Sequence, residues 1–213
     1  AAIKMARYHS NREKFVAFLG GFHGRTIGAL SLTGSKSVQK KGFSPLMPGV
    51  HHIPYAYCYR CAYGKQVETC HVECVKVLEE TLFKTILPAE EVAAIVLEPI
   101  QGEGGYVVPP QKFFDELRRV ADKHGILLVF DEVQSGVGRT GKMFACEHWG
   151  VKPDIMTVAK GLGSGLPIGA VIARKSLMSQ WQRGAHGNTY GGNPITCAAA
   201  SATLDLVDAG YRD

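Results

Sequence analysis

Five short apolar runs, separated by polar and helix-forming segments, constrain the fold more than any other feature of this 213-residue chain. They are residues 15–19, 92–100, 126–130, 155–158 and 170–173. The second and third runs are almost continuously apolar, which is typical of strands covered on both faces. Between them, residues 111–124 carry apolar side chains at helical spacing and stop at Gly125. The alternation predicts an α/β fold, a mostly parallel central sheet with helices on both faces in three α/β/α layers.

Polar or glycine residues stand at the ends of four of these runs. They are Gly20-Gly21, Glu98, Asp131 and Lys160. In open parallel α/β sheets the ligand crevice lies beyond the carboxyl ends of the strands. We therefore expect four separate strands to deliver these residues to one edge of the sheet.

Lys160 and Asp131 combine two chemical functions that one type of cofactor requires. Lys160 follows an apolar strand and precedes three glycines within five residues, where a bulky ligand can approach the backbone. A lysine that is desolvated among apolar walls becomes a nucleophile toward carbonyl groups. An aldehyde cofactor with a pyridine nitrogen needs such a lysine, and also a buried carboxylate that keeps the nitrogen protonated. Asp131, directly after the run 126–130, is the candidate for that carboxylate.

Two segments resemble the signature of a known family. Residues 131–141 (DEVQSGVGRTG), followed by 157–163 (TVAKGLG), look like class III (ω) aminotransferases, which are fold type I enzymes that use pyridoxal 5′-phosphate (PLP). Three further segments match motifs of this family in the expected order: 22–26 (FHGRT), 98–105 (EPIQGEGG) and 188–194 (NTYGGNP). The resemblance covers essentially the whole chain.

The resemblance implies a set of cofactor-binding residues. Lys160 would carry PLP as a Schiff base and move a proton between substrate and cofactor, and Asp131 would pair with the ring nitrogen. Gln134 would lie on the side of the ring hydroxyl, Phe22 would stack on the ring, and His23 is placed with them as a cofactor-binding residue. The alternatives are that Phe22 belongs to the hydrophobic core and that His23 only shapes its turn.

The resemblance also implies which residues would bind the substrate and which would reach a partner subunit. Arg25 would bind a substrate carboxylate, for which a planar bidentate donor suits better than lysine. Glu103 resembles an acid that pairs in relatives with an arginine further along the chain, and Glu98 is a third candidate on the substrate side. Thr189 would reach the cofactor phosphate of a neighbouring subunit, so that a homodimer shares the site. A surface position for Arg25 and a purely structural Glu98 remain open alternatives.

The assignment of the amino donor and the assignment of the function class each have alternatives. The Tyr- and Cys-rich insertion at 54–74, with Phe22 and Glu103, favours transfer from 4-aminobutyrate to 2-oxoglutarate, and acetylornithine or ornithine is the alternative donor. A dinucleotide-binding domain is suggested by 136–141, which fits G-x-G-x-x-G. That fingerprint should open a helix and lead to an acid at the next strand end, whereas the next strand ends at Lys160. A non-catalytic binding fragment is the other rival.

Four cysteines cluster in that insertion as Cys58-x2-Cys61-x8-Cys70-x3-Cys74. Two close pairs are compatible with a thiolate site for zinc or iron. The pairs are unequal and contain little glycine to turn the chain around a metal, so disulfides and free thiols stay open, with free thiols preferred.

Composition and the two ends of the sequence give further expectations about partners, location and domain organisation. The balance of 24 basic against 19 acidic residues gives a mild +5, without the basic–aromatic interleaving of a nucleic-acid surface. No run approaches the roughly 18 apolar residues of a membrane span, and no signal peptide is visible, so we expect a cytoplasmic protein without nucleic-acid or membrane partners. Residues 1–213 are predicted to form one PLP-binding large domain. We expect it to lack an N-terminal phosphate-binding segment and a C-terminal small domain, and to be inactive by itself.

Overall fold

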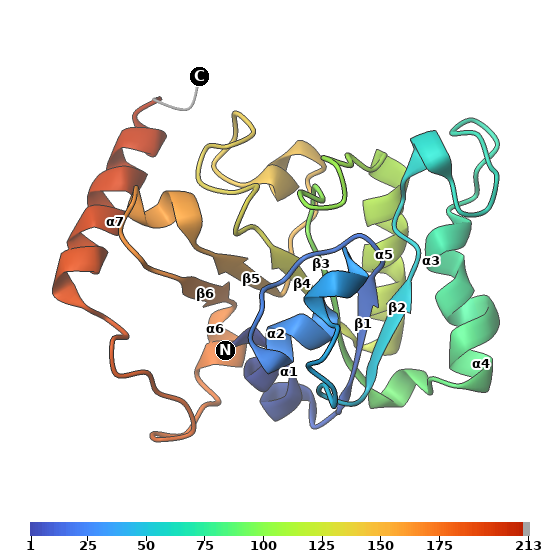
Figure 1. Cartoon of the computed structure of the whole chain (residues 1–213), viewed down its shortest axis with the longest axis horizontal. Helices are drawn as coiled ribbons and strands as arrows, with labels where there is room; N and C mark the ends of the chain where they lie inside the picture. Colours follow the sequence, from blue (N-terminus) through green and yellow to red (C-terminus); the bar gives the residue numbers. More distant parts are fainter. Residues whose placement is uncertain (211–213) are drawn as a thin grey trace.

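The computed structural model describes residues 1–210, and it is built on one six-stranded sheet (Figure 1). The order is β2-β1-β3-β4-β5-β6, in which the first five strands are parallel and β6 is antiparallel to β5. The strands are β1 (Lys14–Phe18), β2 (Val50–Ile53), β3 (Val92–Leu97), β4 (Leu127–Asp131), β5 (Ile155–Val158) and β6 (Ala170–Ala173). All five predicted strands are therefore present in a mostly parallel sheet.

Two features of the sheet differ from the expectation. β2 was not predicted, because its sequence Val-His-His-Ile has no apolar run and the strand lies at an edge of the sheet. β3 ends at Leu97 rather than Ile100. After it the chain turns back on itself, and the backbones of Gln101 and Val107 pair as an isolated antiparallel bridge.

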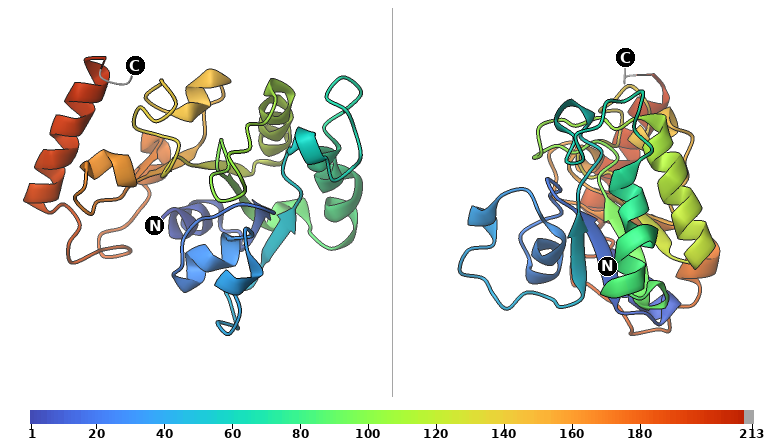
Figure 2. Two further views of the ribbon diagram at one scale, coloured as in Figure 1. Left: turned by 45° about the horizontal axis from the view of Figure 1, so that its top comes forward. Right: turned by 90° about the vertical axis from the view of Figure 1, so that its right-hand side faces the viewer.

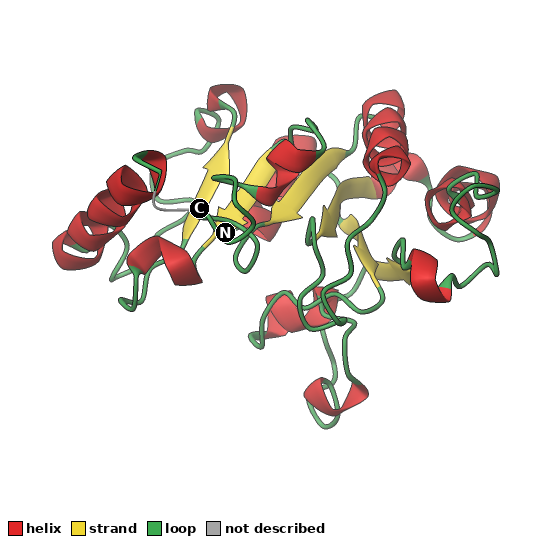
Figure 3. Cartoon of the chain, turned by 90° about the horizontal axis from the view of Figure 1, so that it is seen from above, coloured by secondary structure: helices red, strands yellow, loops and turns green. Residues whose placement is uncertain are grey.

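Helices cover both faces of the sheet, as predicted (Figures 2 and 3). On one face lie α5 and a continuous helical column formed by α3, a π-helical turn at Leu78–Leu82 and α4; on the other lie α1 and α2. The helices are α1 (Ala2–Ser10), α2 (Ile27–Leu32), α3 (Glu73–Val77), α4 (Phe83–Thr85), α5 (Gln111–His124), α6 (Lys175–Met178) and α7 (Pro194–Asp208). Short 3₁₀ turns lie at Ser37–Gln39, Cys58–Arg60, Ala89–Glu91, Ala145–His148 and Lys160–Gly163.

Alternation along the strands builds a separate core on each face. In β1, Val16 and Phe18 belong to the core under α5, whereas Phe15 and Ala17 belong to the core under α1. This follows from the period of two along a strand, which sends successive side chains to opposite faces. The side chains of β4 alternate between the two cores in the same way. The sheet is therefore buried on both faces, and its strands need continuous apolar runs.

The core under α5 is rich in aromatic rings that meet edge to face. Phe113 of α5 contacts Phe18, Tyr55 and Phe114 at ring-centroid distances of 5.7, 5.1 and 5.4 Å. Gly125 ends the helix in the left-handed conformation, with φ 62°, as its position in the sequence predicted. This core holds α5 against β4, the strand that ends at Asp131.

α7 lies at the edge of the molecule beside the turn Lys160–Gly163 (Figure 1). The Asn193 side chain begins it by accepting hydrogen bonds from the amides of Ile195 and Thr196. Among residues 1–210 no helix is long and apolar enough to cross a membrane. The cytoplasmic location remains a prediction.

Candidate active site

The carboxyl ends of β1, β3, β4 and β5 meet at one edge of the sheet, because these strands are parallel. The segment after β1 carries Phe22 and His23 to this edge, Glu98 follows β3 directly, and Asp131 is the last residue of β4. Lys160 follows β5 after one intervening residue. As predicted, these residues lie at the same edge of the sheet.

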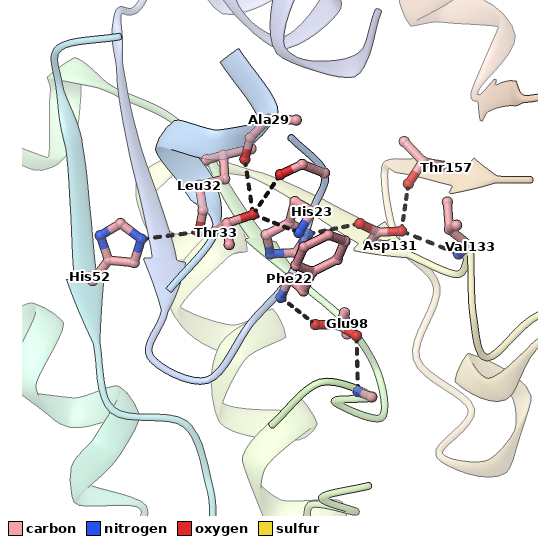
Figure 4. Close-up of polar contacts among 12 residues, drawn as sticks. Phe22, His23, Ala29, Leu32, Thr33, His52, Glu98, Asp131, Val133 and Thr157 are labelled. Atoms are coloured by element: carbon pink, nitrogen blue, oxygen red, sulfur yellow. Dashed lines mark hydrogen bonds and ion pairs between the residues drawn. The ribbon is translucent and has the colours of Figure 1, made fainter. Parts of the chain in front are cut away.

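Asp131 is buried and its carboxylate is held by three donors (Figure 4). Oδ2 lies 2.7 Å from Nδ1 of His23, whose side chain is only 3% exposed. Oδ1 accepts hydrogen bonds from Thr157 Oγ1 at 3.1 Å and from the Val133 amide at 3.2 Å. Within residues 1–210, His23 Nε2 is buried without a hydrogen-bond partner. His23 thus does more than shape its turn, since its ring fixes the orientation of the carboxylate.

Glu98 is buried as well, but both of its carboxylate oxygens are occupied by backbone donors (Figure 4). The Phe22 amide donates to Oε1 at 2.7 Å and the Gly102 amide to Oε2 at 3.0 Å. Burial raises the pKa of Glu98, and the two amide donors act in the opposite direction. These contacts favour the structural alternative, in which Glu98 joins the loop after β1 to the loop after β3.

Lys160 begins a 3₁₀ turn with φ 43°, a left-handed backbone conformation that costs a non-glycine residue strain. Its side chain is exposed and borders a cavity of about 600 Å³ together with Gln134 and Glu103. Asp131 and His23 border a second cavity of about 200 Å³. Val133 lies in the wall of both cavities, so the cavity at Lys160 and the cavity at Asp131 are neighbours.

Gln134 packs closely against the loop that follows β3. A Cβ atom at Gly102 would lie 2.0 Å from its Oε1, a separation that real structures do not allow. Gly102 is therefore required for this side chain to keep its position at the cavity. The Gly102 amide also donates a hydrogen bond to Glu98, so the same residue that leaves room for Gln134 is anchored to the end of β3.

Phe22 and Arg25 form a pair on the loop between β1 and α2. The Arg25 guanidinium lies 5.8 Å from the centre of the Phe22 ring, within the range of a cation–π contact. Arg25 is exposed and Phe22 is half-buried. Phe22 belongs to neither hydrophobic core, so the alternative that it is a core residue does not hold.

Glu103 is exposed and pairs with Lys36, whose Nζ lies 2.9 Å from Oε2. The hydrogen bond from Lys36 holds the pKa of Glu103 below its ordinary value. Thr189 is exposed in the loop before α7 and lines neither of the two cavities. A single chain therefore brings Glu103 to the Lys160 cavity but leaves Thr189 outside it.

Comparison with known proteins decides the family. A family model for class-III aminotransferases matches residues 1–210. The chain belongs to this family. It is 46% identical to a leucine/methionine racemase of Thermococcus litoralis, over 97% of this chain and 46% of that protein. It is 45% identical to an acetylornithine aminotransferase of Methanopyrus kandleri, over 97% and 47%, and 47% identical to a putrescine aminotransferase of Pectobacterium atrosepticum, over 96% and 41%.

Solved structures show the same fold. A PLP-bound amine transaminase from an uncultivated Pseudomonas species superimposes with a TM-score of 0.89 at 37% identity, over 98% of this chain and 50% of that one. An (S)-enantioselective ω-transaminase from Thermomicrobium roseum gives 0.90 at 39% identity, over 98% and 48%. The fold type I prediction is confirmed. The chain spans about half the length of the relatives it matches, and none of the relatives named here is a 4-aminobutyrate enzyme.

Three residues of this class-III aminotransferase chain that contribute to the site were missed by the sequence reasoning. Thr157 and Val133 hold Asp131, as described above. Glu132 is fully buried; its carboxylate accepts from Ser135 Oγ at 2.5 Å and from the amides of Ala145 and Cys146 at 3.1 and 2.8 Å. It thereby secures the long loop after β4. Its position directly after Asp131 in the motif did not distinguish a buried anchor from an exposed acid.

The rival dinucleotide-binding motif is wrong. Residues 136–141 lie in turns and open no helix; the first helical segment after them is the 3₁₀ turn Ala145–His148. The class-III aminotransferase family model also matches residues 1–210, which excludes a dinucleotide-binding domain in this part of the chain.

The four clustered cysteines are free thiols, and burial raises the pKa of Cys74 to about 12. As they stand, no three His, Cys, Asp or Glu side chains among residues 1–210 are arranged to hold a metal ion.

Proposed function

We propose that this protein is a PLP-dependent aminotransferase, with Lys160 as the residue that binds the cofactor. The observation that carries the proposal is that an amine and a buried carboxylate follow two neighbouring parallel strands at the same edge of the sheet. The amine of Lys160 follows β5, and the buried carboxylate of Asp131 ends the adjacent β4. A PLP-bound amine transaminase has the same fold, and the class-III aminotransferase family model matches residues 1–210.

The residues at the sheet edge fit PLP in their chemistry. Lys160 offers an amine for an aldehyde, and Asp131 offers a carboxylate for a pyridine nitrogen, oriented by His23 and Thr157. His23 Nε2, buried and unpartnered among residues 1–210, is a polar atom at the wall of the cavity beside Asp131. PLP, when bound, supplies a ring that withdraws electrons from the substrate carbon that carries the amino group.

The protein groups then have distinct tasks. Asp131 keeps a proton on the ring nitrogen, since an ionised carboxylate favours the protonated form of a basic group beside it. Lys160 moves a proton at the substrate carbon as a general base and acid. Phe22 would stack on the ring of bound PLP and exclude water, and Gln134 would hydrogen-bond on the side of the ring hydroxyl.

On the substrate side, Arg25 binds a carboxylate, and Glu103 pairs with an arginine further along the chain and releases it when the substrate is a dicarboxylate. Glu103 carries Lys36 as its partner in this chain. Thr189 reaches the cofactor phosphate of a second subunit, in a homodimer with a shared site. Thr189 is exposed and lines neither the Lys160 cavity nor the Asp131 cavity of its own chain, which supports a role toward a partner.

We infer that the amino donor carries a terminal amine, with 4-aminobutyrate first and acetylornithine or ornithine second, and that 2-oxoglutarate is the acceptor. Relatives named for acetylornithine and putrescine support a terminal amine as the common feature of the donor. The Tyr- and Cys-rich insertion is the sequence feature that favours 4-aminobutyrate.

A second candidate function is racemisation of an amino acid. Two relatives at 46% and 43% identity are named as racemases, one for leucine and methionine and one for alanine and serine. The same lysine and aspartate serve both reactions, because each begins with removal of a proton from the carbon that carries the amine. Release of a D-amino acid without any 2-oxo acid would favour this candidate.

The binding proposal is tested by borohydride reduction of the full-length protein with PLP, followed by peptide mapping. The label is expected on Lys160, and a label on another lysine would refute the assignment. Glutamate formation from 2-oxoglutarate, measured with each donor in turn, then ranks the donors. Absence of glutamate with all of them, with Lys160 labelled, would reject aminotransfer while leaving PLP binding intact.

A further inference from the structure

The Tyr- and Cys-rich insertion folds into a small site of its own between β2 and α3 (Figure 1). Cys58 and Cys61 lie on and directly after the 3₁₀ turn Cys58–Arg60, and Cys70 and Cys74 lie before and within α3. All four cysteines line one cavity of about 20 Å³. That volume is enough for a single water-sized occupant and not for a larger group.

The tertiary structure removes the objection that the sequence raised against a metal. Gly64, between the two cysteine pairs, takes the left-handed conformation with φ 64°, and so does Val72, within the second pair, with φ 63°. All four cysteines nevertheless line the same cavity, so the small number of glycines does not keep the two pairs apart. Two separate segments then each present a pair of thiols to the same cavity. The spacings of two and three residues within the pairs fall in the range of structural zinc sites.

Burial raises the pKa of the free Cys58 and Cys74 thiols, but two donors beside the cavity act in favour of a negatively charged thiolate centre. Nζ of Lys112 donates hydrogen bonds to the carbonyl oxygens of Val67 and Cys70, which brings a positive charge to the loop that holds the thiols. The Val72 amide donates to Cys70 Sγ at 3.2 Å. Hydrogen bonds of this kind from the second shell orient the ligands of a metal.

We propose that Cys58, Cys61, Cys70 and Cys74 bind one zinc ion as a tetrahedral structural site. As described above, the free thiols are not yet arranged around a common point. Binding therefore requires that each thiol releases its proton to solvent and that Cys70 Sγ leaves Glu73 Oε2, to which it donates at 3.3 Å. Binding further requires that changes of side-chain rotamer within the shared cavity bring the four sulfur atoms around one point.

The site has a structural consequence for the edge of the sheet that carries Asp131. Tyr55, in the wall of the cysteine cavity, is buried, and its hydroxyl donates to the carbonyl oxygens of Glu98 and Pro99 at 2.8 and 3.0 Å. A zinc ion would fix the insertion and thereby the segment after β3. This inference does not depend on the aminotransferase activity, because metal content is measured without turnover.

The test is the zinc content of the full-length protein, measured by inductively coupled plasma mass spectrometry after expression with added zinc and removal of loosely bound metal. We expect about one zinc ion per chain in the wild-type protein. Cys58→Ser and Cys74→Ser should each lose it, whereas Cys197→Ser, a substitution at an exposed cysteine outside the cluster, should retain it. Zinc that persists in either cluster variant would overturn the proposal.

A second measurement uses the wild-type protein alone, in case a cluster variant fails to fold. Cobalt(II) in place of zinc should give thiolate-to-metal charge-transfer bands and the visible bands of a tetrahedral centre. Wild-type protein without zinc and without these bands would refute the site. An intact mass lower by two hydrogen atoms per bond under non-reducing conditions would show disulfides instead, and iron with acid-labile sulfide would show a cluster; both results would also refute it.

Discussion

Replacement of Asp131 by asparagine separates the charge of this residue from its place in the fold. Asparagine keeps a carbonyl oxygen for the two donors on the Oδ1 side, Thr157 Oγ1 and the Val133 amide. It places a neutral amide where the carboxylate met His23 Nδ1 at 2.7 Å. The fold should therefore persist, whereas the negative charge that stabilises a protonated ring nitrogen is lost.

The magnitude follows from the type of interaction removed. Loss of one preorganised electrostatic contact to the reacting system costs about 2.7–4 kcal/mol, or about 10²–10³ in turnover. We expect a decrease of that size in the kcat of the full-length Asp131→Asn protein, with PLP still attached to Lys160. Thr157→Val is the matched control, because it removes one neutral hydrogen bond to the same carboxylate, worth about 1 kcal/mol or about fivefold.

The assay combines glutamate formation under saturating donor with the absorbance of bound PLP. Borohydride labelling of Lys160 in the variant shows that the cofactor is retained. A turnover of Asp131→Asn close to that of the wild type, or a smaller loss than that of Thr157→Val, would refute the role of the charge.

Three other substitutions test the remaining contacts. Arg25→Lys keeps the charge but removes the planar fork, so the KM for a carboxylate substrate should rise about ten- to a hundredfold, or about 1.4–2.8 kcal/mol; an unchanged KM for donor and acceptor would exclude the clamp. Phe113→Ala, at a fully buried ring, should lower the free energy of unfolding in urea by about 3–5 kcal/mol, and a loss below about 1 kcal/mol would show that the core can collapse around the gap. Burial acts to raise the pKa of Glu79, but hydrogen bonds led by Arg119 lower it to about 2. Because the folded pKa lies below the ordinary value, the stability that Glu79 contributes is present above about pH 4.5 and is lost as the pH falls toward 2. Glu79→Gln should thus cost about 1 kcal/mol at pH 7 and nothing near pH 2, and a difference that is constant with pH would contradict this.

Much of the candidate site was predictable because its residues follow strands that the sequence marks clearly. Lys160 and Asp131 could be assigned since each stands at the end of an apolar run, and parallel strands end at the same edge of a sheet. Glu132 was missed because the residue type does not show whether a side chain is buried. An acid directly after a strand has the same local sequence pattern whether it is exposed or anchors a loop. Glu98 had two equal interpretations until its amide partners were known.

The sequence by itself determined the type of fold and the chemistry available at its edge. Apolar runs of the length of strands, a helix with apolar residues at its own period and a glycine at its end are local signals, and the strand–helix alternation follows from them. Only the tertiary structure decided which partners the functional groups have. His23 and Asp131 are separated by 108 residues along the chain, and the two cysteine pairs come from separate segments that line one cavity. Such contacts join segments that are far apart in the sequence, and no repeating pattern in the sequence marks them. They depend on the order of the strands and the conformation of the loops, which form only when the whole sheet is assembled.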